Sequence, residues 1–290
     1  MASLAAIADA ITRATGQPFR LARQQAVGGG DINQSFLLHG TDDRSFFLKL
    51  NAAAQAALFV AEVEGLAALA ATRTLRVPAV IAQGVCDDGS YLVLEYLPLA
   101  GEGDAAALGR QLAALHRHSV SRFGFAHDNF IGSTPQPNGW CADWIEFWRE
   151  RRLGYQLELA QRDGHGGVLQ RLGQELQARL PEWFEDYAPL PSLLHGDLWG
   201  GNHAFLDDGT PVLFDPAAYY GDRECDLAMT ELFGGYPPAF YAAYRAAWPL
   251  HPGYARRKTL YNLYHILNHA HLFGGAYVRQ AQSMMQALLG

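Results

Sequence analysis

A segment rich in glycine and proline, residues 97–103, divides the chain into two parts with different apolar patterns. Before it, short apolar runs bounded by turn residues predict strands at 34–39, 45–50, 79–83 and 90–96. A helix is predicted at 52–71. After it, apolar residues recur mostly at helical spacing, with one strand-forming stretch at 193–215. Because glycine and proline end regular elements, we predict two lobes, 1–97 and 98–290. This is an α+β protein with a small antiparallel sheet lobe and a larger helical lobe.

The second part is expected to be mostly helical. Asp104 is placed to cap its first helix, in which Leu108, Leu112 and Leu115 share one face. Further helices are predicted at 140–161, 167–180, 226–233, 238–247 and 257–289.

Composition excludes several classes of protein. Hydrophobic residues make up 49% of the chain and charged residues 18%, so the chain folds. The net charge of -7 argues against a nucleic-acid partner. The three cysteines show no paired spacing, so we expect no disulfide framework and a cytoplasmic location. The N-terminus lacks the basic segment of a signal peptide, and the uncharged run 52–61 is too short to span a bilayer, so we expect no membrane partner.

Lysine is rare in this chain. Of its 22 basic residues other than histidine, only Lys49 and Lys258 are lysines, and Lys49 lies in an apolar, strand-forming run. Glu62 follows 13 residues later, on the helical face that carries Leu58 and Leu66. A carboxylate on a buried face needs a partner, and Lys49 is the expected one. The alternative is that Glu62 lies at the edge of this face and reaches water.

Three consecutive glycines, Gly28, Gly29 and Gly30, stand between two predicted extended segments. Glycine lets a backbone approach a ligand closely and turn its N–H groups toward an anion. The segment matches neither common glycine-rich nucleotide motif. An ordinary hairpin turn is therefore the alternative to a phosphate-covering turn.

The stretch 193–215 concentrates polar residues around a predicted hairpin, with strands at 203–206 and 211–214 and a four-residue turn at 207–210. If Leu206 pairs with Pro211, Asn202 lies opposite Asp215, and an amide oxygen beside a carboxylate suits a hard divalent cation. Asp197 lies five residues before Asn202, where it can accept a proton beside the metal. The alternative is that these side chains only satisfy the backbone of turns. A lysine, its glutamate, an aspartate, an asparagine and a second aspartate are together the set that phosphoryl transfer uses.

These residues also carry a resemblance. His195-Gly196-Asp197 with Asn202 resembles the catalytic loop of the protein-kinase-like fold, in the form found in small-molecule kinases. The longer match resembles the fructosamine kinase family, at residues 123–125, 129–136, 143–144, 147, 194–202, 215–229, 267–269 and 273–274. Asp215-Pro216-Ala217, in place of Asp-Phe-Gly, is typical of that family.

The resemblance implies a role for each matched residue. Asp197 would be the catalytic base, and Asn202 and Asp215 would bind Mg²⁺. Lys49 and Glu62 would be the phosphate pair, in which Lys49 positions the ATP phosphates and Glu62 holds Lys49. Asp226 would brace the catalytic loop. Gly28, Gly29 and Gly30 would cover the phosphates, and the backbone of Glu95, Tyr96 and Leu97 would read adenine.

The resemblance also implies an activity. The family phosphorylates a sugar hydroxyl of ketosamines, on small amines or on glycated protein lysines, and the product then falls apart and frees the amine. One alternative is a kinase of another hydroxyl acceptor such as an aminoglycoside, and another is a non-catalytic nucleotide-binding protein. A third is a metal hydrolase built on His195, Asp197 and Asp215. The hydrolase would leave Lys49 and Glu62 without a role. A monomer is favoured.

Three residues are candidates for contact with the acceptor: Trp199, Trp144 and His269. Trp199 stands beside Asp197, where it can pack on a sugar. Trp144 belongs to a tryptophan repeat at 140, 144 and 148 that otherwise predicts core packing. His269 belongs to a histidine cluster with residues 265 and 271, for which we favour a pocket wall or a buried core role over a metal site.

Overall fold

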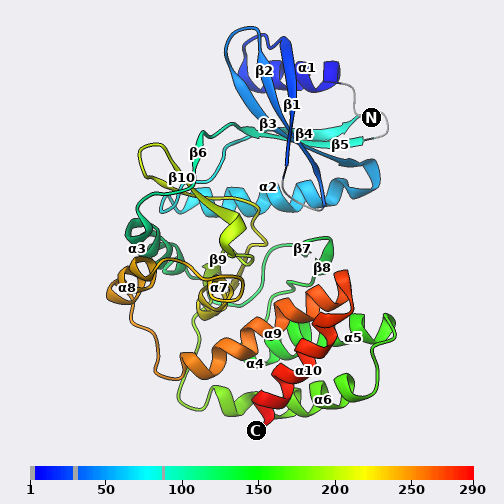
Figure 1. Ribbon diagram of the computed structural model, residues 1–290, viewed down its shortest axis with the longest axis vertical. Helices are drawn as coiled ribbons and strands as arrows, with labels where there is room; N and C mark the ends of the chain where they lie inside the picture. Colours follow the sequence, from blue (N-terminus) through cyan, green and yellow to red (C-terminus); the bar gives the residue numbers. More distant parts are fainter. Residues whose placement is uncertain (1–3, 29–31, 87–88) are drawn as a thin grey trace.

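The computed structural model describes residues 4–28, 32–86 and 89–290, and its two lobes are distinct in Figure 1. The first contains the sheet β1 (Leu21–Val27), β2 (Gln34–Gly40), β3 (Ser45–Ala52), β5 (Gly89–Glu95) and β4 (Val80–Cys86), antiparallel and in that spatial order. The predicted turn at 86–89 includes residues 87 and 88, which lie outside the described part of the chain. The fold class expected from the sequence is confirmed.

Both faces of the sheet are covered by helices, which explains why β5 is buried along almost its whole length. Helix α1 (Leu4–Thr15) covers one face and packs on Phe46, Leu48 and Val93. Helix α2 (Ala56–Ala71) covers the other and packs near Leu92 and Leu94. Because successive strand residues point to opposite faces, Lys49 follows Phe47 onto the α2 side.

Helix α2 is preceded by the 3₁₀ turn η1 (Ala53–Gln55), so the predicted helix at 52–71 is correct apart from its first turn. Among the described residues, Ala53–Ala71 is the one helical stretch long and apolar enough to cross a membrane by length and composition alone, with a mean hydropathy of 1.5. In this structure it packs on the sheet. Its Glu62 forms an ion pair with Lys49, and a carboxylate oxygen of its Glu64 lies 3.1 Å from His127 Nδ1.

The second lobe is built around a helix buried along most of its length, α9 (Tyr254–Phe273). It packs against α5, α7 and α10. The helices of this lobe are α3 (Ala105–His116), α4 (Trp144–Phe147), α5 (Tyr155–Arg162), α6 (Val168–Arg179), α7 (Glu224–Thr230), α8 (Pro238–Ala247), α9 and α10 (Ala276–Leu289), with the π-helix η2 (Trp148–Gly154) and the 3₁₀ turns η3 (Leu180–Trp183) and η4 (Gly200–Asn202).

Short strands surround the region between the lobes. They are β6 (Leu99–Ala100), β7 (Asn129–Ile131), β8 (Thr134–Gln136), β9 (Ser192–Leu194), β10 (His203–Leu206), β11 (Pro211–Leu213) and β12 (Tyr219–Gly221). Strand β6 lies inside the predicted boundary segment and pairs with β10 of the helical lobe. The connection between the lobes is therefore itself hydrogen-bonded into a sheet.

Two predicted helices differ from the structure. The helix expected to start at residue 140 starts at Trp144, because the Asp143 side chain accepts from the Glu146 backbone N–H at 2.7 Å and caps the helix there. The pattern at 257–289 is two helices, because Gly274 (φ 62°) and Gly275 (φ 56°) adopt the left-handed region between them. The β7–β8 hairpin was not predicted.

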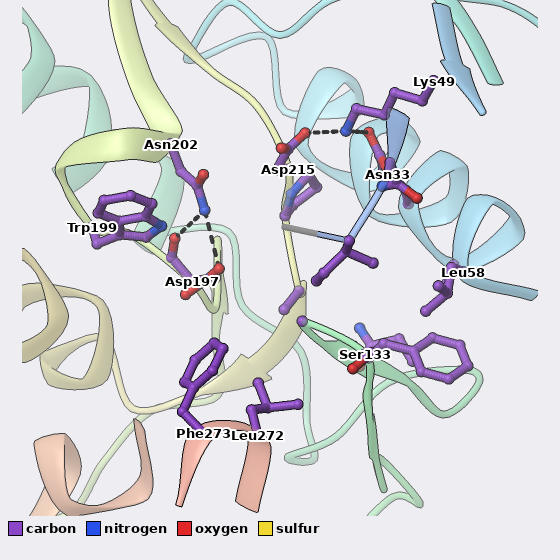
Figure 2. Close-up of a pocket in the computed structure, with 18 residues that line it drawn as sticks. Asn33, Lys49, Leu58, Ser133, Asp197, Trp199, Asn202, Asp215, Leu272 and Phe273 are labelled. Atoms are coloured by element: carbon purple, nitrogen blue, oxygen red, sulfur yellow. Dashed lines mark hydrogen bonds and ion pairs between the residues drawn. The ribbon is translucent and has the colours of Figure 1, made fainter. Parts of the chain in front are cut away.

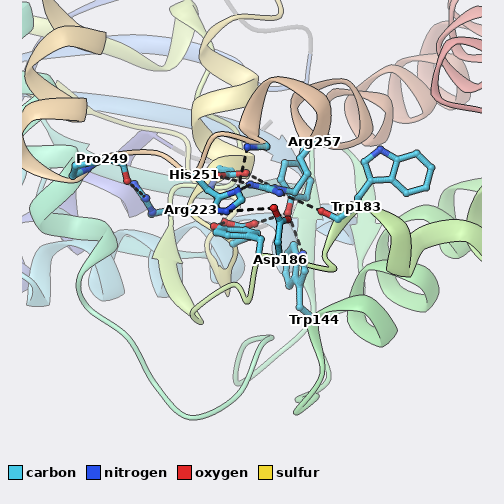
Figure 3. Close-up of polar contacts among 12 residues, drawn as sticks. Trp144, Trp183, Asp186, Arg223, Pro249, His251 and Arg257 are labelled. Atoms are coloured by element: carbon cyan, nitrogen blue, oxygen red, sulfur yellow. Dashed lines mark hydrogen bonds and ion pairs between the residues drawn. The ribbon is translucent and has the colours of Figure 1, made fainter. Parts of the chain in front are cut away.

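A buried ion pair lies between two helices of the second lobe, among the polar contacts that Figure 3 shows. Arg257 is 1% exposed and donates to both carboxylate oxygens of Glu224, at 2.7 and 3.1 Å, and to the carbonyl of Trp183 at 3.2 Å. Burial raises the pKa of Glu224 to about 7, against the opposing effect of Arg257. The pair joins α7 to α9.

We predict that Arg257→Leu lowers the free energy of unfolding by about 3–5 kcal/mol, because it leaves the Glu224 carboxylate buried without its cation. Urea denaturation measures this change. The neighbouring Lys258→Leu is the control, since Lys258 pairs with Glu231 near the surface, where an ion pair contributes about 1 kcal/mol or less. Equal losses in the two variants would contradict the prediction.

Candidate active site

The loop that carries Asp197 is held in place by the side chain of Asp226, in the first turn of α7. Asp226 is 1% exposed and accepts from the backbone N–H groups of His195 (2.7 Å) and Gly196 (2.8 Å). Burial would raise the pKa of Asp226. The hydrogen bond and charge of His116, at 3.1 Å, together with the charge of His195 and the Gly196 N–H bond, leave that pKa lowered. The bracing contacts expected of Asp226 are thus present.

Gly196 cannot be replaced by a larger residue in this loop. Its φ is 84°, and a Cβ there would lie 2.1 Å from the carbonyl oxygen of Ala217. The backbone N–H of Ala217 in turn donates to the carbonyl of His195 at 2.9 Å. The glycine therefore lets the Asp197 loop pack directly on the segment that follows Asp215.

Asn202 orients the Asp197 side chain. Its Nδ2 donates to the backbone carbonyl of Asp197 at 2.8 Å and to its Oδ2 at 3.1 Å. Figure 2 shows the Asn202 amide oxygen turned away from Asp197. Burial, followed by the negative charge of Asp215, raises the pKa of Asp197 to about 7.

The predicted register of the β10–β11 hairpin was wrong by one residue. Phe205, not Leu206, pairs with Pro211, and the Phe214 N–H donates to the carbonyl of Asn202. The turn has three residues, 207–209, because Gly209 adopts φ 82° and the Leu206 N–H donates to Thr210. Asn202 therefore lies opposite Phe214, one residue before Asp215.

Asp215 reaches the site through an unusual backbone conformation. Its φ is 58°, in the left-handed region that residues other than glycine rarely adopt. The backbone reverses there, and the Asp215 carboxylate forms an ion pair with Lys49 (Figure 2). A strained residue in a cavity is a common mark of a functional site.

Lys49 contacts two carboxylates from different elements. It is 5% exposed, and its Nζ donates to Glu62 Oε1 at 2.7 Å and to Asp215 Oδ1. The predicted Lys49–Glu62 pair is confirmed. Burial alone would lower the pKa of Lys49, but the charges of Glu62 and Asp215 outweigh it and raise the pKa.

These side chains line one cavity of about 490 Å³ between the lobes. Its charged members are Lys49, Glu62, Asp197 and Asp215. The rest of its wall is apolar or carries uncharged amides and hydroxyls, from residues 32, 33, 58, 61, 129, 130, 132, 133, 199, 202, 216, 217, 272 and 273. Figure 2 shows Trp199, Leu272 and Phe273 on the side of Asp197 away from Lys49.

The oxygen ligands in this cavity fit a hard cation. Asp215 offers a carboxylate and Asn202 an amide oxygen, and Mg²⁺ is commonly held by one or two such groups together with substrate phosphates. Within the described ranges, no group of three or more His, Cys, Asp or Glu side chains is arranged to hold a metal. The histidine cluster is not such a site: His265 is 6% exposed, and His271 contacts Asp163 at 2.5 Å.

Two residues predicted to contact the acceptor do not line the cavity. Trp144 is 2% exposed and donates its Nε1–H to Tyr261 at 3.2 Å, because the α4 face that carries it packs on α9. His269 lies next to Phe273, with ring centroids 5.5 Å apart, and the cavity is lined by Phe273 instead. Trp199 does line the cavity and is 40% exposed.

The expected nucleotide contacts lie at the edge of what the structure describes. Gly28 is exposed, and Gly29 and Gly30 fall outside the described residues. Glu95 ends β5, and its side chain pairs with Arg76 and accepts from the Ala79 N–H. Residues 95–97 are not among those that line the cavity.

The β7–β8 hairpin is the part of the site that sequence reasoning missed. The Asn129 side chain donates to the carbonyl of Ala218 at 2.8 Å and accepts from Gln136 at 2.7 Å, which ties the hairpin to the segment after Asp215. Phe130 and Ser133 line the cavity. The signal was present, since residues 129–136 belong to the family resemblance, but three-residue strands carry no periodicity to detect.

Comparisons with known proteins find relatives over nearly the whole chain. The family model "Fructosamine kinase" matches residues 3–290. A "Probable ketoamine kinase" of Synechocystis sp. is 49% identical over 98% of this chain and 96% of its own length. A chloroplastic "Protein-ribulosamine 3-kinase" of Arabidopsis thaliana is 43% identical over 94% of this chain and 85% of its own.

Solved structures share the fold. The crystal structure of "Putative fructosamine-3-kinase" from Haemophilus somnus covers 98% of this chain and 97% of its own, with a TM-score of 0.89 and 30% identity. An ADP-bound aminoglycoside phosphotransferase covers 96% of this chain and 98% of its own, with a TM-score of 0.65 at 11% identity, which shows the protein-kinase-like fold alone.

We predict that Asp226→Asn accelerates amide hydrogen exchange at His195 and Gly196 by about 10- to 100-fold, because an amide cannot accept both backbone hydrogen bonds and face His116. Hydrogen exchange followed by mass spectrometry or NMR measures this. Asp104→Asn is the control, since Asp104 caps α3 with a single accepted bond that asparagine also makes. Unchanged exchange at both amides would show that Asp226 is not the brace.

Proposed function

The chain belongs to the fructosamine kinase family, and we propose that it transfers a phosphoryl group from ATP to a sugar hydroxyl of ketosamines. The observation that carries this proposal is the buried Lys49, which contacts Glu62 and Asp215 in the cavity that Asp197 and Asn202 also line. These are the groups that phosphoryl transfer requires. The printed names of the relatives, ketoamine kinase and ribulosamine 3-kinase, support the same acceptor class.

The nucleotide lies between the lobes 1–97 and 98–290 in this proposal. Lys49 binds its phosphates, and Glu62 holds the lysine in place. Gly28, Gly29 and Gly30 cover the phosphates, and the backbone of Glu95, Tyr96 and Leu97 contacts adenine. A lysine suits this role because its compact ammonium serves a phosphate and a carboxylate at once, which the planar fork of arginine does not.

Asn202 and Asp215 hold Mg²⁺ in the proposed complex. When bound, the ion neutralises charge that develops on the phosphates during transfer. The Asn202 amide is already oriented for this, because its Nδ2 is occupied by Asp197 and its oxygen points away. Lys49 forms ion pairs with both Asp215 and Glu62 in this structure. When Asp215 holds the ion, Lys49 keeps Glu62 as its partner.

Asp197 is the proposed base. Asn202 occupies its Oδ2, which leaves Oδ1 to accept the proton of the acceptor hydroxyl. The raised pKa, about 7, makes the carboxylate a stronger proton acceptor than a solvated aspartate. Asp226 acts through the loop backbone and positions Asp197 without touching substrate.

The charge distribution favours ketosamines over aminoglycosides. An aminoglycoside carries several ammonium groups and requires carboxylates along its binding surface. The carboxylates that line this cavity are Glu62, Asp197 and Asp215. Glu62 and Asp215 contact Lys49, and Asp197 is the proposed base at the transfer site. A non-catalytic nucleotide-binding protein would not require the full set of transfer residues.

The proposed activity is a repair step. A ketosamine phosphate breaks down and frees its amine, so phosphorylation removes the adduct from small amines or protein lysines. We propose a cytoplasmic location and a monomeric enzyme. The described cysteines, Cys86, Cys141 and Cys225, are unpaired, which is consistent with a reducing compartment.

We predict turnover of ATP with ribulosamine and other ketosamines, and little with aminoglycosides. Asp197→Ala should lower turnover by roughly 100- to 10,000-fold, since it removes the general base. A coupled assay of ADP release with a panel of acceptors measures both, and circular dichroism checks that the variant folds. Near-normal turnover in Asp197→Ala would refute the base assignment, and preference for aminoglycosides would refute the acceptor class.

The two lysines of this chain provide a matched pair of variants. We predict that Lys49→Arg lowers kcat by about 100-fold or more, because a guanidinium cannot keep the geometry of a single Nζ between two carboxylates and a phosphate. Lys258→Arg should be close to wild type, since its contact with Glu231 lies near the surface. Wild-type kcat in Lys49→Arg would remove Lys49 from the mechanism.

A further inference from the structure

The sequence Leu-Phe-Gly-Gly occurs twice, at residues 232–235 and 272–275. In each copy both glycines adopt the left-handed region, with φ of 97° and 78° for Gly234 and Gly235 and of 62° and 56° for Gly274 and Gly275. The chain therefore turns directly after each phenylalanine. Phe233 and Phe273 are left 36% and 57% exposed.

The two copies meet in space at one histidine. The His269 ring centroid lies 5.1 Å from that of Phe233, 5.5 Å from that of Phe273 and 5.0 Å from that of Tyr277. Its Nδ1 lies 2.8 Å from the carbonyl oxygen of His265, which can only accept, so Nδ1 carries the hydrogen and the ring is fixed. We call Phe233, His269, Phe273 and Tyr277 the aromatic lip.

Phe273 connects the aromatic lip to the cavity, and the other three lip residues are reached from it through the His269 ring. Phe273 lines the cavity together with Leu272, Trp199 and Asp197 (Figure 2). Leu272 is held against the β7–β8 turn, since a Cβ on Gly132 would lie 3.4 Å from its Cδ1. Exposed aromatic side chains that adjoin a cavity commonly mark a contact surface for a ligand or partner.

The lip differs in chemistry from the inner cavity. The charged cavity residues, Lys49, Glu62, Asp197 and Asp215, surround the transfer site, and the lip consists of aromatic rings. In a ketosamine the amine is bonded to the carbon next to the carbonyl, so few bonds separate it from the sugar hydroxyls. A sugar with one hydroxyl at Asp197 therefore keeps its amine substituent within the same cavity, whose wall includes Phe273.

Resting on the proposed function, we propose that the aromatic lip binds the aliphatic stem of a glycated lysine in a peptide or protein. Four methylenes carry the adduct away from the lysine backbone, and they are apolar along their length. Aromatic faces bury such methylenes and attract the protonated secondary amine through cation–π contact. A ketosamine of a small amine has no chain to reach Phe233, so the lip gives selectivity for peptide-borne acceptors.

The test compares two acceptors: a peptide with ribulosamine on a central lysine, and the ribulosamine of methylamine. The measured quantity is the ratio of their kcat/KM values. We expect Phe233→Ala and Phe273→Ala each to lower this ratio about 10-fold through the KM of the peptide, and Phe273→Tyr to retain it. Leu190→Ala is the control, since Leu190 is 58% exposed and does not line the cavity.

The outcomes separate this proposal from the proposed function. An unchanged ratio in both phenylalanine-to-alanine variants, with the peptide phosphorylated by the wild type, overturns the role of the lip alone. A wild type that phosphorylates neither acceptor overturns the proposed function and the lip with it. A drop of equal size in Leu190→Ala would assign the effect to surface apolarity in general and also overturn the proposal.

Discussion

The buried ammonium of Lys49 is the interaction on which the rest of this structure depends. A cation this deeply buried is stable only if carboxylates surround it, and the two that do come from different lobes. Glu62 belongs to α2 and Asp215 to the segment after β11. One charge therefore fixes the sheet, the helix beneath it and the helical lobe relative to one another.

The backbone around Asp215 is built to make that contact possible. Asp215 adopts φ 58°, and Pro216 packs so closely on α2 that a Cβ on Gly65 would lie 3.0 Å from its ring. On the other side, Gly196 allows the Asp197 loop to approach Ala217, and Asp226 holds that loop by its backbone N–H groups. Strain at one residue is thus supported by close packing on both sides.

The cavity separates two kinds of chemistry along its length. Its inner end combines a buried cation with carboxylates, which suits phosphates and a reacting hydroxyl. Its outer end is formed by Trp199, Leu272 and Phe273, which suit the apolar part of an acceptor. The outer end comes from the loop after Asp197 and from the end of α9.

The sequence by itself determined the two-lobe α+β fold, the Lys49–Glu62 pair and the candidate transfer residues, because these depend on local periodicity and on the cost of burying a charge. It did not determine the register of the β10–β11 hairpin, which Gly209 in the turn shifted by one residue. It also did not determine the burial of Trp144, which depends on how α4 packs on α9. His269 and Phe273 share one face of α9 four residues apart, but only the tertiary structure brought Phe233 next to His269. The Phe233–His269 contact joins residues 36 apart in the chain and follows from the packing of α9 on the segment after α7, which no local pattern encodes.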